Sequence, residues 1–435
     1  MTAARRLASF LLWLLLLLPV LVALLQVSVA DFVDTGALLN LLGRLTGIAG
    51  LVCLLLSAVL IVRVPGFDRL FGGLTRLWRT HHLLGAASFL FLLAHPLLLA
   101  FAAADVSLPA AVQTLFPPHG GLAVWLGWSA LLVMMIFLAP GFSFFGEPEY
   151  QHWKWLHRSA GIAVLLALAH TFMLARSLPA PSSWVVWGGL SVLAVLSVAY
   201  RFVFSKHLGR LPYRVSGISH PANNVVELSL DAEGRALDYR PGQFVYLTPL
   251  DRNLAAGYGE EHPYTLSSSP RESTLRIAIK DLGDASRAIQ QIAPQTRVKI
   301  EGPYGDFFPD NPGCELWIAG GIGITPFLAR ARHFAATSLS VDVKLVFCVQ
   351  DEPRALFREE LEALSRTVTG FALVMHYFYQ EGPLTAEFLT THCPDLAQRD
   401  AYICGPSPLI ALSESLLLHS GCSRKHIHTE EFVLL

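Results

Sequence analysis

Four histidines in two apolar stretches are the residues best placed to do chemistry in this sequence. His81 and His95 lie fourteen residues apart in the first stretch. On an α-helix this spacing brings the second side chain to within about 40° of the first, about 21 Å further along the axis, so one helix face carries both. His157 and His170 are thirteen residues apart, about 140° from alignment. The second helix must therefore bend, or its side chains must reach.

Ionisable side chains inside an apolar span are costly and need a reason, and imidazole is a common metal ligand. Four imidazoles at two depths predict two b-type haems, each held by one histidine from each helix. The motifs His81-x-x-x-Gly85 and His157-x-x-x-Gly161 each place a glycine four residues after a histidine, which lets a flat macrocycle approach the backbone. Packing or hydrogen bonding is the alternative for any one histidine, and His82 is the alternative to His81 as a ligand.

Composition divides the chain into an apolar half and a polar half. Hydrophobic residues make up 53% of the 435 residues, yet residues 1–210 hold only 19 Asp, Glu, Lys and Arg against 46 in the remaining 225. A membrane half therefore precedes a soluble half. No basic block indicates nucleic acid as a partner. The six cysteines are scattered without a CxxC, which favours reduced thiols over a disulfide framework or a metal site.

The apolar half predicts a six-helix transmembrane bundle in a lipid bilayer. The six candidate spans are 8–28, 37–62, 81–103, 120–140, 153–175 and 183–204. Basic residues concentrate in the loops of one side, which the positive-inside rule assigns to the cytoplasm together with the N-terminus and the polar half. We therefore expect a multi-pass protein of the cell (inner) membrane, in which His81 pairs in depth with His157, and His95 with His170.

Two features of the first spans allow a second interpretation. The first run, ending at Val27-Ser-Val-Ala30, also has the pattern of a cleaved signal peptide, and cleavage would leave the later topology unchanged. Arg44 lies at the outer end of its span, where a guanidinium could bind a haem propionate or an anionic acceptor, or could simply reach the membrane interface.

The polar half predicts two folded parts in succession. Short alternating segments broken by Pro and Gly, such as Gln243–Leu247 and Thr274–Ile279, indicate a small antiparallel β-barrel. After about Gly313, strands alternate with helical stretches, which indicates an α/β domain with a parallel sheet. The predicted domains are a transmembrane domain over 1–205, a barrel domain over 206–312 and an α/β domain over 313–435.

Glycine-rich turns in the polar half are suited to bind a dinucleotide and a flavin. Gly320-Gly-Ile-Gly-Ile-Thr-Pro326 joins a strand to a helix, where backbone N–H groups and the helix N-terminus favour a pyrophosphate. His262-Pro-Tyr-Thr-Leu-Ser-Ser268 offers an aromatic plane beside a hydroxyl donor, as a flavin ring requires. Gly302-Pro-Tyr-Gly305 and Cys404-Gly-Pro406 are further tight turns after strands. Taken singly, each of these motifs is equally consistent with an ordinary turn.

With these motifs together, the whole chain resembles the ferric reductase and NADPH oxidase superfamily: a bis-haem membrane domain fused to a ferredoxin-reductase-like FAD and NAD(P)H module. The resemblance implies roles for further residues. It implies a flavin site formed by His262, Pro263, Tyr264, Thr265, Ser267, Lys280, Ser286, Gly302 and Gly305. It implies a nicotinamide dinucleotide site formed by Gly320, Gly321, Gly323, Thr325, Pro326, Cys404, Gly405 and Pro406. Catalytic roles fall to Cys404 beside the nicotinamide and to Phe432, which would cover the flavin; for Phe432, plain packing of the chain end is the alternative.

The expected activity is transfer of electrons from cytosolic NADPH or NADH through FAD and two b-type haems to an external one-electron acceptor. A ferric chelate is the expected acceptor. Oxygen and a periplasmic or membrane redox partner are the alternatives, and oxygen is disfavoured because Leu99 stands where eukaryotic oxidases of this superfamily often have a histidine. Asp351 and Arg354 leave the choice between NADH and NADPH open.

Overall fold

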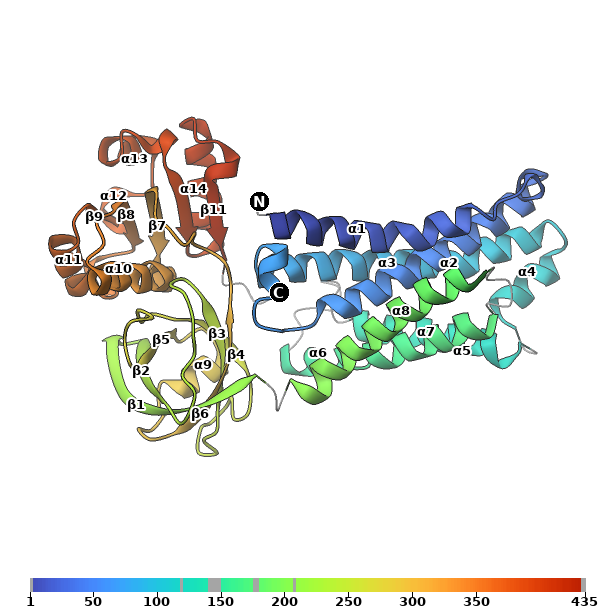
Figure 1. Cartoon of the computed structure of the whole chain (residues 1–435), viewed down its shortest axis with the longest axis horizontal. Coiled ribbons are helices and arrows are strands. Elements are labelled where there is room, and N and C mark those ends of the chain that lie inside the picture. The colour runs from blue at the N-terminus through green and yellow to red at the C-terminus, as the bar shows by residue number, and fades with distance from the viewer. Residues whose placement is uncertain (1–2, 118–119, 140–149, 175–179, 206–208, 432–435) are drawn as a thin grey trace. The chain divides into compact units, whose positions relative to one another are not determined.

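The computed structural model describes residues 3–117, 120–139, 150–174, 180–205 and 209–431. The chain forms two compact units (Figure 1). Unit 1 contains residues 1–63 and 74–207, and unit 2 contains residues 64–73 and 208–435. The division does not follow the sequence order, because the short segment Val64–Gly73 belongs to unit 2 although it connects two helices of unit 1.

Unit 1 is a bundle of apolar helices that run lengthwise beside one another (Figure 1). Its described elements are α1 (Ala3–Leu24), the 3₁₀ turn η1 (Val29–Phe32), α2 (Thr35–Leu60), α3 (Leu74–Ala104), α4 (Leu108–Leu115), α5 (Leu122–Leu138), α6 (Tyr150–His157), α7 (Ala160–Leu174) and α8 (Ala180–Ala199), which continues as the π-helical turn Tyr200–Phe204. Side-chain caps begin two of these helices: Asp34 accepts the Ala37 N–H at α2, and Ser107 accepts the Ala110 N–H at α4.

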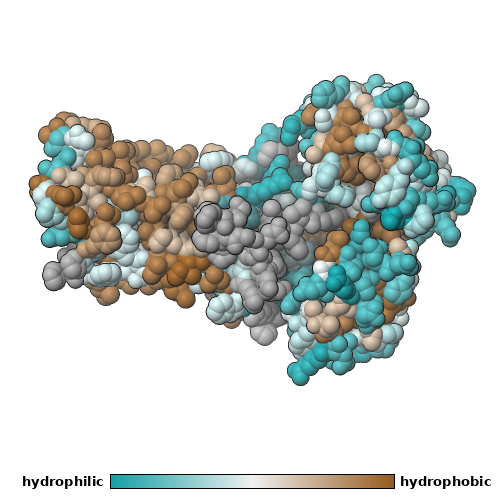
Figure 2. All heavy atoms as spheres, turned by 180° about the vertical axis from the view of Figure 1, so that it is seen from behind, coloured by the Kyte–Doolittle hydropathy of each residue, from teal (hydrophilic) through white to brown (hydrophobic). Residues whose placement is uncertain are grey.

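Five described helical segments are long and apolar enough to cross a membrane: Arg5–Leu24, Thr35–Leu60, Leu74–Ala104, Trp153–Leu174 and Val185–Phe204. The remaining expected span, 120–140, corresponds to α5 (Leu122–Leu138), a shorter apolar helix of 17 residues. Apolar side chains cover much of the visible face of this unit (Figure 2). A surface of this kind is compatible with lipid rather than water.

Unit 2 begins with an antiparallel sheet whose strand order is β4-β3-β6-β1-β2-β5. The strands are β1 (Arg210–Ala222), β2 (Val225–Ala232), β3 (Phe244–Pro249), β4 (His262–Thr265), β5 (Leu275–Lys280) and β6 (Arg297–Tyr304), with the short helix α9 (Asp284–Ile289) before β6. A bridge between Leu266 and Ile277 joins the β4 end of the sheet to β5. The sheet therefore curves into the partly closed barrel that the sequence predicts.

The second sheet of unit 2 is parallel, with strand order β11-β10-β7-β8-β9. Its strands are β7 (Cys314–Gly320), β8 (Asp342–Val349), β9 (Phe371–Tyr377), β10 (Asp400–Cys404) and β11 (Ile427–Glu430). The accompanying helices are α10 (Thr325–Thr337), α11 (Arg358–Thr367), α12 (Phe378–Glu381), α13 (Ala386–His392) and α14 (Ser407–His419). The predicted α/β fold with a parallel sheet is confirmed.

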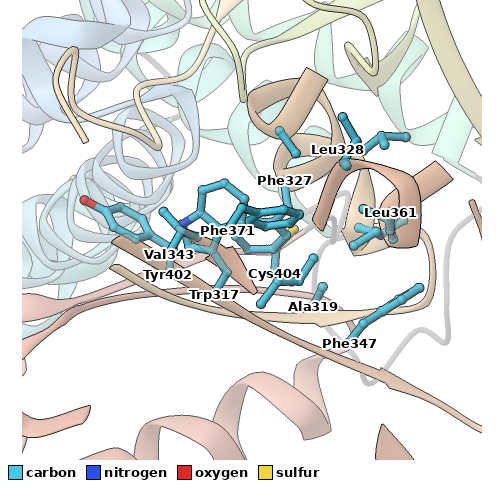
Figure 3. Close-up of a cluster of buried hydrophobic side chains, with 14 of the residues drawn as sticks. Trp317, Ala319, Phe327, Leu328, Val343, Phe347, Leu361, Phe371, Tyr402 and Cys404 are labelled. Atoms are coloured by element: carbon cyan, nitrogen blue, oxygen red, sulfur yellow. The ribbon is translucent and has the colours of Figure 1, made fainter. Parts of the chain in front are cut away.

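Alternation along β7 shows how this sheet buries both faces. Trp317 and Ala319 point into one core with Phe327 of α10, as Figure 3 shows, whereas Leu316 and Ile318 point into a second core with α13 and α14. Strands that are buried on both faces carry apolar residues at consecutive positions, as β7 does. The two cores hold the carboxyl ends of β7 and β10 side by side, and the two glycine turns at which the sequence predicts a dinucleotide follow these ends.

Candidate functional site

His95 of α3 and His170 of α7, which the sequence predicts to be the outer pair, lie opposite each other. The ring centroids of His95 and His170 are 6.5 Å apart. Metal bonds to imidazole nitrogen are about 2 Å long, so two imidazoles that hold one metal ion from opposite sides have their centroids about 6 Å apart. The structure therefore spaces these rings as axial ligands require.

Hydrogen bonds also orient the two outer rings. His95 Nδ1 lies 2.7 Å from the Gly43 carbonyl oxygen, and His170 Nδ1 lies 2.7 Å from the Ala123 carbonyl oxygen. A carbonyl only accepts, so each Nδ1 must carry the proton. Each Nε2 is left with a free lone pair, which is the arrangement found in metal-ligating histidines.

Two glycines make room for the outer rings. A Cβ on Gly47 would lie 2.8 Å from His95 Nδ1, and a Cβ on Gly127 would lie 2.6 Å from His170 Nδ1. Neither glycine was identified as a site residue from the sequence, although Gly43, Gly47 and Gly50 repeat at helical spacing. That repeat allows α2 to approach α3 closely, and it is the feature of the sequence from which the role of Gly47 could have been predicted.

A cavity of about 640 Å³ lies beside the outer pair within unit 1. His95, His170 and Arg44 line it together with mainly apolar side chains, among them Leu92, Trp128 and Trp187. Arg44 also forms an ion pair with Asp31 of η1. The cavity, the free Nε2 atoms and the glycine spacing fit a haem at this level.

The inner pair combines His81 of α3 with His157 at the end of α6, with ring centroids 6.1 Å apart. His81 Nδ1 lies 2.9 Å from the Ser57 carbonyl oxygen, which again leaves Nε2 free. His157 Nδ1 is buried and has no hydrogen-bond partner in the described part of the chain. His82 lies beside His81, with a centroid distance of 5.4 Å. The structure thus brings His81 opposite His157, and the spacing fits a second haem.

A break in the second histidine helix explains how thirteen residues can span two levels. α6 ends at His157 and α7 begins at Ala160. Tight bonds from Arg158 N to the Trp155 carbonyl and from Ser159 N to the Leu156 carbonyl turn the chain between them. The helix is interrupted here, as the thirteen-residue spacing led us to expect, and His157 lies opposite His81.

In unit 2 the first part of the flavin motif forms β4, an edge strand that pairs with β3, and β6 follows on the other side of β3. Thr265 pairs with Phe244, and Tyr264 pairs with Val245. Gly302 to Tyr304, expected to form a tight turn, instead belong to β6. A Cβ on Gly305 would lie 3.3 Å from the Phe244 ring, so this end of β6 approaches the same edge of the barrel. Burial raises the pKa of Tyr264 above its usual value, which keeps its hydroxyl neutral.

Five other expected flavin residues lie on β4, on β5 or near these strands, and three of them have polar partners within the protein. Ser267 donates to Glu227 over 2.7 Å, and Ser286 accepts the N–H groups of Leu282 and Gly283 at the start of α9. His262 Nε2 lies 3.2 Å from Glu260. Lys280 ends β5, and Pro263 lies on β4 opposite Tyr246.

The two dinucleotide turns pack backbone against backbone after β7 and β10. A Cβ on Gly323 would lie 2.4 Å from the Cys404 carbonyl oxygen, and a Cβ on Gly405 would lie 3.1 Å from Gly320 Cα. Gly320 also approaches Pro406, while Gly321 adopts a positive φ of 54°. The structure brings together Gly320, Gly323, Cys404, Gly405 and Pro406. At Gly323 a side chain would collide with the backbone of Cys404, so only glycine fits at this position.

Thr325 and Pro326 begin α10 directly after this turn. The Thr325 hydroxyl donates to the Ile322 carbonyl over 3.0 Å. Cys404 is fully buried, and burial followed by the charge of Glu430 raises its thiol pKa well above the usual value. The thiol is therefore neutral and can only be a weak donor or a packing group. Phe432 lies outside the described residues.

The comparisons with known proteins agree with this arrangement. Residues 46–168 match a family described as ferric reductase like transmembrane component, residues 211–307 match an FAD-binding domain, and residues 317–415 match an oxidoreductase NAD-binding domain. These matches define an NAD(P)H-dependent FAD oxidoreductase with a membrane component.

In this order, the three domains give the chain the architecture of the ferric reductase and NADPH oxidase-like flavo-oxidoreductases. The resemblance seen in the sequence is therefore confirmed.

Individual relatives share the reductase part. The chain is 32% identical over 203 residues to the ferredoxin reductase component of a 3-ketosteroid-9-alpha-monooxygenase of Mycolicibacterium smegmatis, covering 45% of this chain and 56% of the relative. It is 28% identical over 213 residues to a glycine betaine monooxygenase reductase subunit of Chromohalobacter salexigens, with the same coverage. The chain thus spans about half the length of these curated relatives.

Solved structures resemble the chain more distantly. The FAD/NAD binding domain of a nitric oxide dioxygenase of Vibrio cholerae is 22% identical, with 51% of this chain and 98% of that chain covered and a TM-score of 0.47. A flavohemoglobin of Malassezia yamatoensis is 17% identical, with 92% and 99% covered and a TM-score of 0.48.

Proposed function

We propose that this chain is a multi-pass membrane protein that passes electrons from cytoplasmic NADH or NADPH, through FAD and two b-type haems, to a one-electron acceptor on the opposite side. Its three domains would be residues 1–205, 206–312 and 313–435. The observation that carries the proposal is the pair of facing histidine couples, spaced 6.1 and 6.5 Å between ring centroids.

Each part of the chain has a distinct task in this proposal. When bound, FAD accepts two electrons as a hydride equivalent and releases them singly, and haem iron carries one electron. The turns at Gly320 and Gly405 hold the dinucleotide against the carboxyl edge of the parallel sheet. The barrel edge at Tyr264 and Gly305 holds the flavin. The carbonyls of Gly43, Ala123 and Ser57 orient three of the four imidazoles.

A ferric chelate is the acceptor that we propose. Arg44 lines the outer cavity beside its ion-pair partner Asp31, and the several donors of a guanidinium can also bind the anionic ligands that keep ferric iron soluble. Leu99 lies near α2, since a Cβ on Gly43 would meet it at 2.8 Å, and offers no proton donor. Oxygen is the second candidate because the rest of the cavity lining is mainly apolar.

Haem content tests the ligand assignment. His95→Ala or His170→Ala should lower the haem content from two per chain to one and leave reduction of the flavin by NADH or NADPH intact, because the two cofactors bind in different parts of the chain. His81→Ala should lose the inner haem, and His82→Ala is the matched control that keeps both. Two haems per chain in His95→Ala or His170→Ala would refute the outer assignment, and haem loss in His82→Ala alone would reassign the inner ligand.

The acceptor is tested on the same preparation. After reduction by NADH or NADPH in a stopped-flow instrument, the haem bands should reoxidise faster with ferric citrate than with air-saturated buffer. Fast reoxidation by air with release of superoxide would favour the oxygen alternative.

A further inference from the structure

The segment between α2 and α3 brings a buried acid into the reductase unit. Val64–Gly73 belongs to unit 2, and its single 3₁₀ turn, η2, runs from Asp68 to Phe71. Asp68 is 1% exposed. A carboxyl group that is buried to this degree needs partners, because removal from water disfavours its charge.

The partner of Asp68 is the backbone of Gly305. Asp68 Oδ2 accepts the Gly305 N–H over 2.9 Å, and Gln243 Nε2 donates to the Gly305 carbonyl over 3.0 Å. Gly305 directly follows Tyr304, the last residue of β6, and has a φ of 94°, a conformation that favours glycine. Two buried side chains, one of them from a distant segment, therefore fix this residue from both sides.

A second carboxyl group approaches the same glycine. Glu430 is the last residue of β11 and pairs in register with Cys404 of β10. Its Oε1 lies 3.6 Å from the position that a Cβ on Gly305 would take. Glu430 Oε2 and Asp68 Oδ1 are both shielded from solvent and have no hydrogen-bond partner within the described ranges.

The surroundings of Asp68 and Glu430 favour the protonated form of both carboxyl groups. Burial and then Asp68 raise the pKa of Glu430 to about 8. Burial raises the pKa of Asp68, against the lowering effects of the Gly305 N–H and Arg69. Cys404 also faces Glu430 and is neutral. Asp68 and Glu430 both lie against Gly305, and two ionised carboxylates near one glycine repel each other, which favours one proton on the pair at neutral pH.

We propose that Asp68 is a positioning residue of the flavin site, which fixes the turn at Gly305 through its backbone N–H and shares one proton with Glu430. Gly305 and Cys404 belong to the proposed flavin and nicotinamide sites, so the inference rests on the proposed function. It makes the segment Val64–Gly73 a part of the reductase site rather than a plain connection between two helices.

The first test measures FAD binding to the full-length protein. Asp68→Ala leaves the buried Gly305 N–H unpaired and should weaken FAD binding about tenfold or more, as expected for loss of one hydrogen bond to a charged group. Asp68→Asn keeps an acceptor oxygen and should stay within about twofold of the wild type. Asp238→Asn, at an exposed position in the barrel domain, is the matched control. Wild-type FAD affinity in Asp68→Ala would overturn the positioning role.

The second test uses the pH dependence of the thermal midpoint of the full-length protein without added FAD. The folded-state pKa of Glu430, about 8, lies above the ordinary value of 4.5. The stability that protonated Glu430 contributes is therefore full below pH 4.5 and is lost as pH rises through 8. Between pH 4.5 and about pH 8, the thermal midpoint of the wild type should fall relative to that of Glu430→Gln. Above this range, the two midpoints should change with pH in the same way.

The Asp68→Asn background decides whether the two acids are coupled. In the Asp68→Asn background, the difference in thermal midpoint between Glu430 and Glu430→Gln should stop changing at a lower pH. Without the neighbouring charge of Asp68, Glu430 loses its proton at a lower pH. An unchanged pH range would overturn the shared proton, whether or not FAD binds. Failure of the wild type to bind FAD would instead refute the proposed function, so the two failures are distinguishable.

Discussion

At the scale of single residues, a polar side chain in the reductase unit can either bind a cofactor or bond to another protein group. The sequence alone does not distinguish these two roles. Ser267 and Ser286 occupy positions expected to bind flavin, yet both hydroxyls bond to protein groups. The motif predicts where a hydroxyl lies along the chain, but its direction depends on Glu227 and on the start of α9. Asp68 was missed because its partner, Gly305, is 237 residues away.

The first prediction at this scale concerns nucleotide choice. Asp351 follows β8 at the carboxyl edge of the parallel sheet, where the adenosine ribose is expected, and Arg354 forms an ion pair with it. Because Asp351 neutralises this arginine and repels a 2′-phosphate, we expect a preference for NADH. Asp351→Asn should raise kcat/KM for NADPH about tenfold, or about 1.4 kcal/mol, with little change for NADH.

Steady-state flavin reduction with each nucleotide measures this ratio. Glu359→Gln, at an exposed position on α11, is the matched control. A wild-type enzyme that already favours NADPH, or an unchanged ratio in Asp351→Asn, would contradict the role of Asp351.

At the scale of elements, glycine spacing and one helix break set the histidine geometry. The sequence predicts the four histidines and the need for a bend, because both follow from the 3.6-residue period. It does not predict which helix supplies the carbonyl group that accepts a hydrogen bond from each imidazole, since that depends on packing between helices. The Gly43 and Ala123 carbonyls that orient the outer pair therefore emerge only in the structure.

The second prediction concerns one of these glycines. Gly47→Ala would place a methyl group 2.8 Å from His95 Nδ1 and must displace the ring. We expect the mutant to lose about half of its haem, namely the outer one, while flavin binding is unchanged. Gly189→Ala on α8 is the control, because a Cβ there meets nothing within 4 Å. A full complement of haem with an unaltered spectrum in Gly47→Ala would contradict the packing role.

At the scale of the whole reductase unit, one arginine joins the barrel to the parallel-sheet part. Arg332 of α10 is 7% exposed; it donates to Glu227 of β2 over 3.0 Å and to the Ser267 carbonyl over 2.8 Å. Its other two nitrogens each donate to Glu360 of α11 over 2.7 Å. The antiparallel and parallel folds are predictable from strand patterns, but this connection is not, because its members are far apart in the sequence.

The third prediction follows from this connection. Arg332→Met leaves Glu227 buried without its cation and should destabilise the unit by about 3–5 kcal/mol. Thermal unfolding followed by flavin fluorescence should show a lower midpoint, with partial recovery in Arg332→Lys. Arg366→Met, on the exposed side of α11, is the control and should leave the midpoint unchanged. Equal midpoints for Arg332→Met and the control would show that the ion pairs contribute no net stability.

The membership of Val64–Gly73 in unit 2 also has a consequence for biosynthesis. Asp68 is synthesised 237 residues before Gly305, the residue to which it binds. At about 5–20 residues per second, translation separates the two by about 12–47 s. During that time α2 and α3 can enter the membrane while the acid between them has no partner. The reductase unit therefore cannot be completed by its C-terminal residues alone, and a nascent chain must keep this segment accessible until Gly305 has been made.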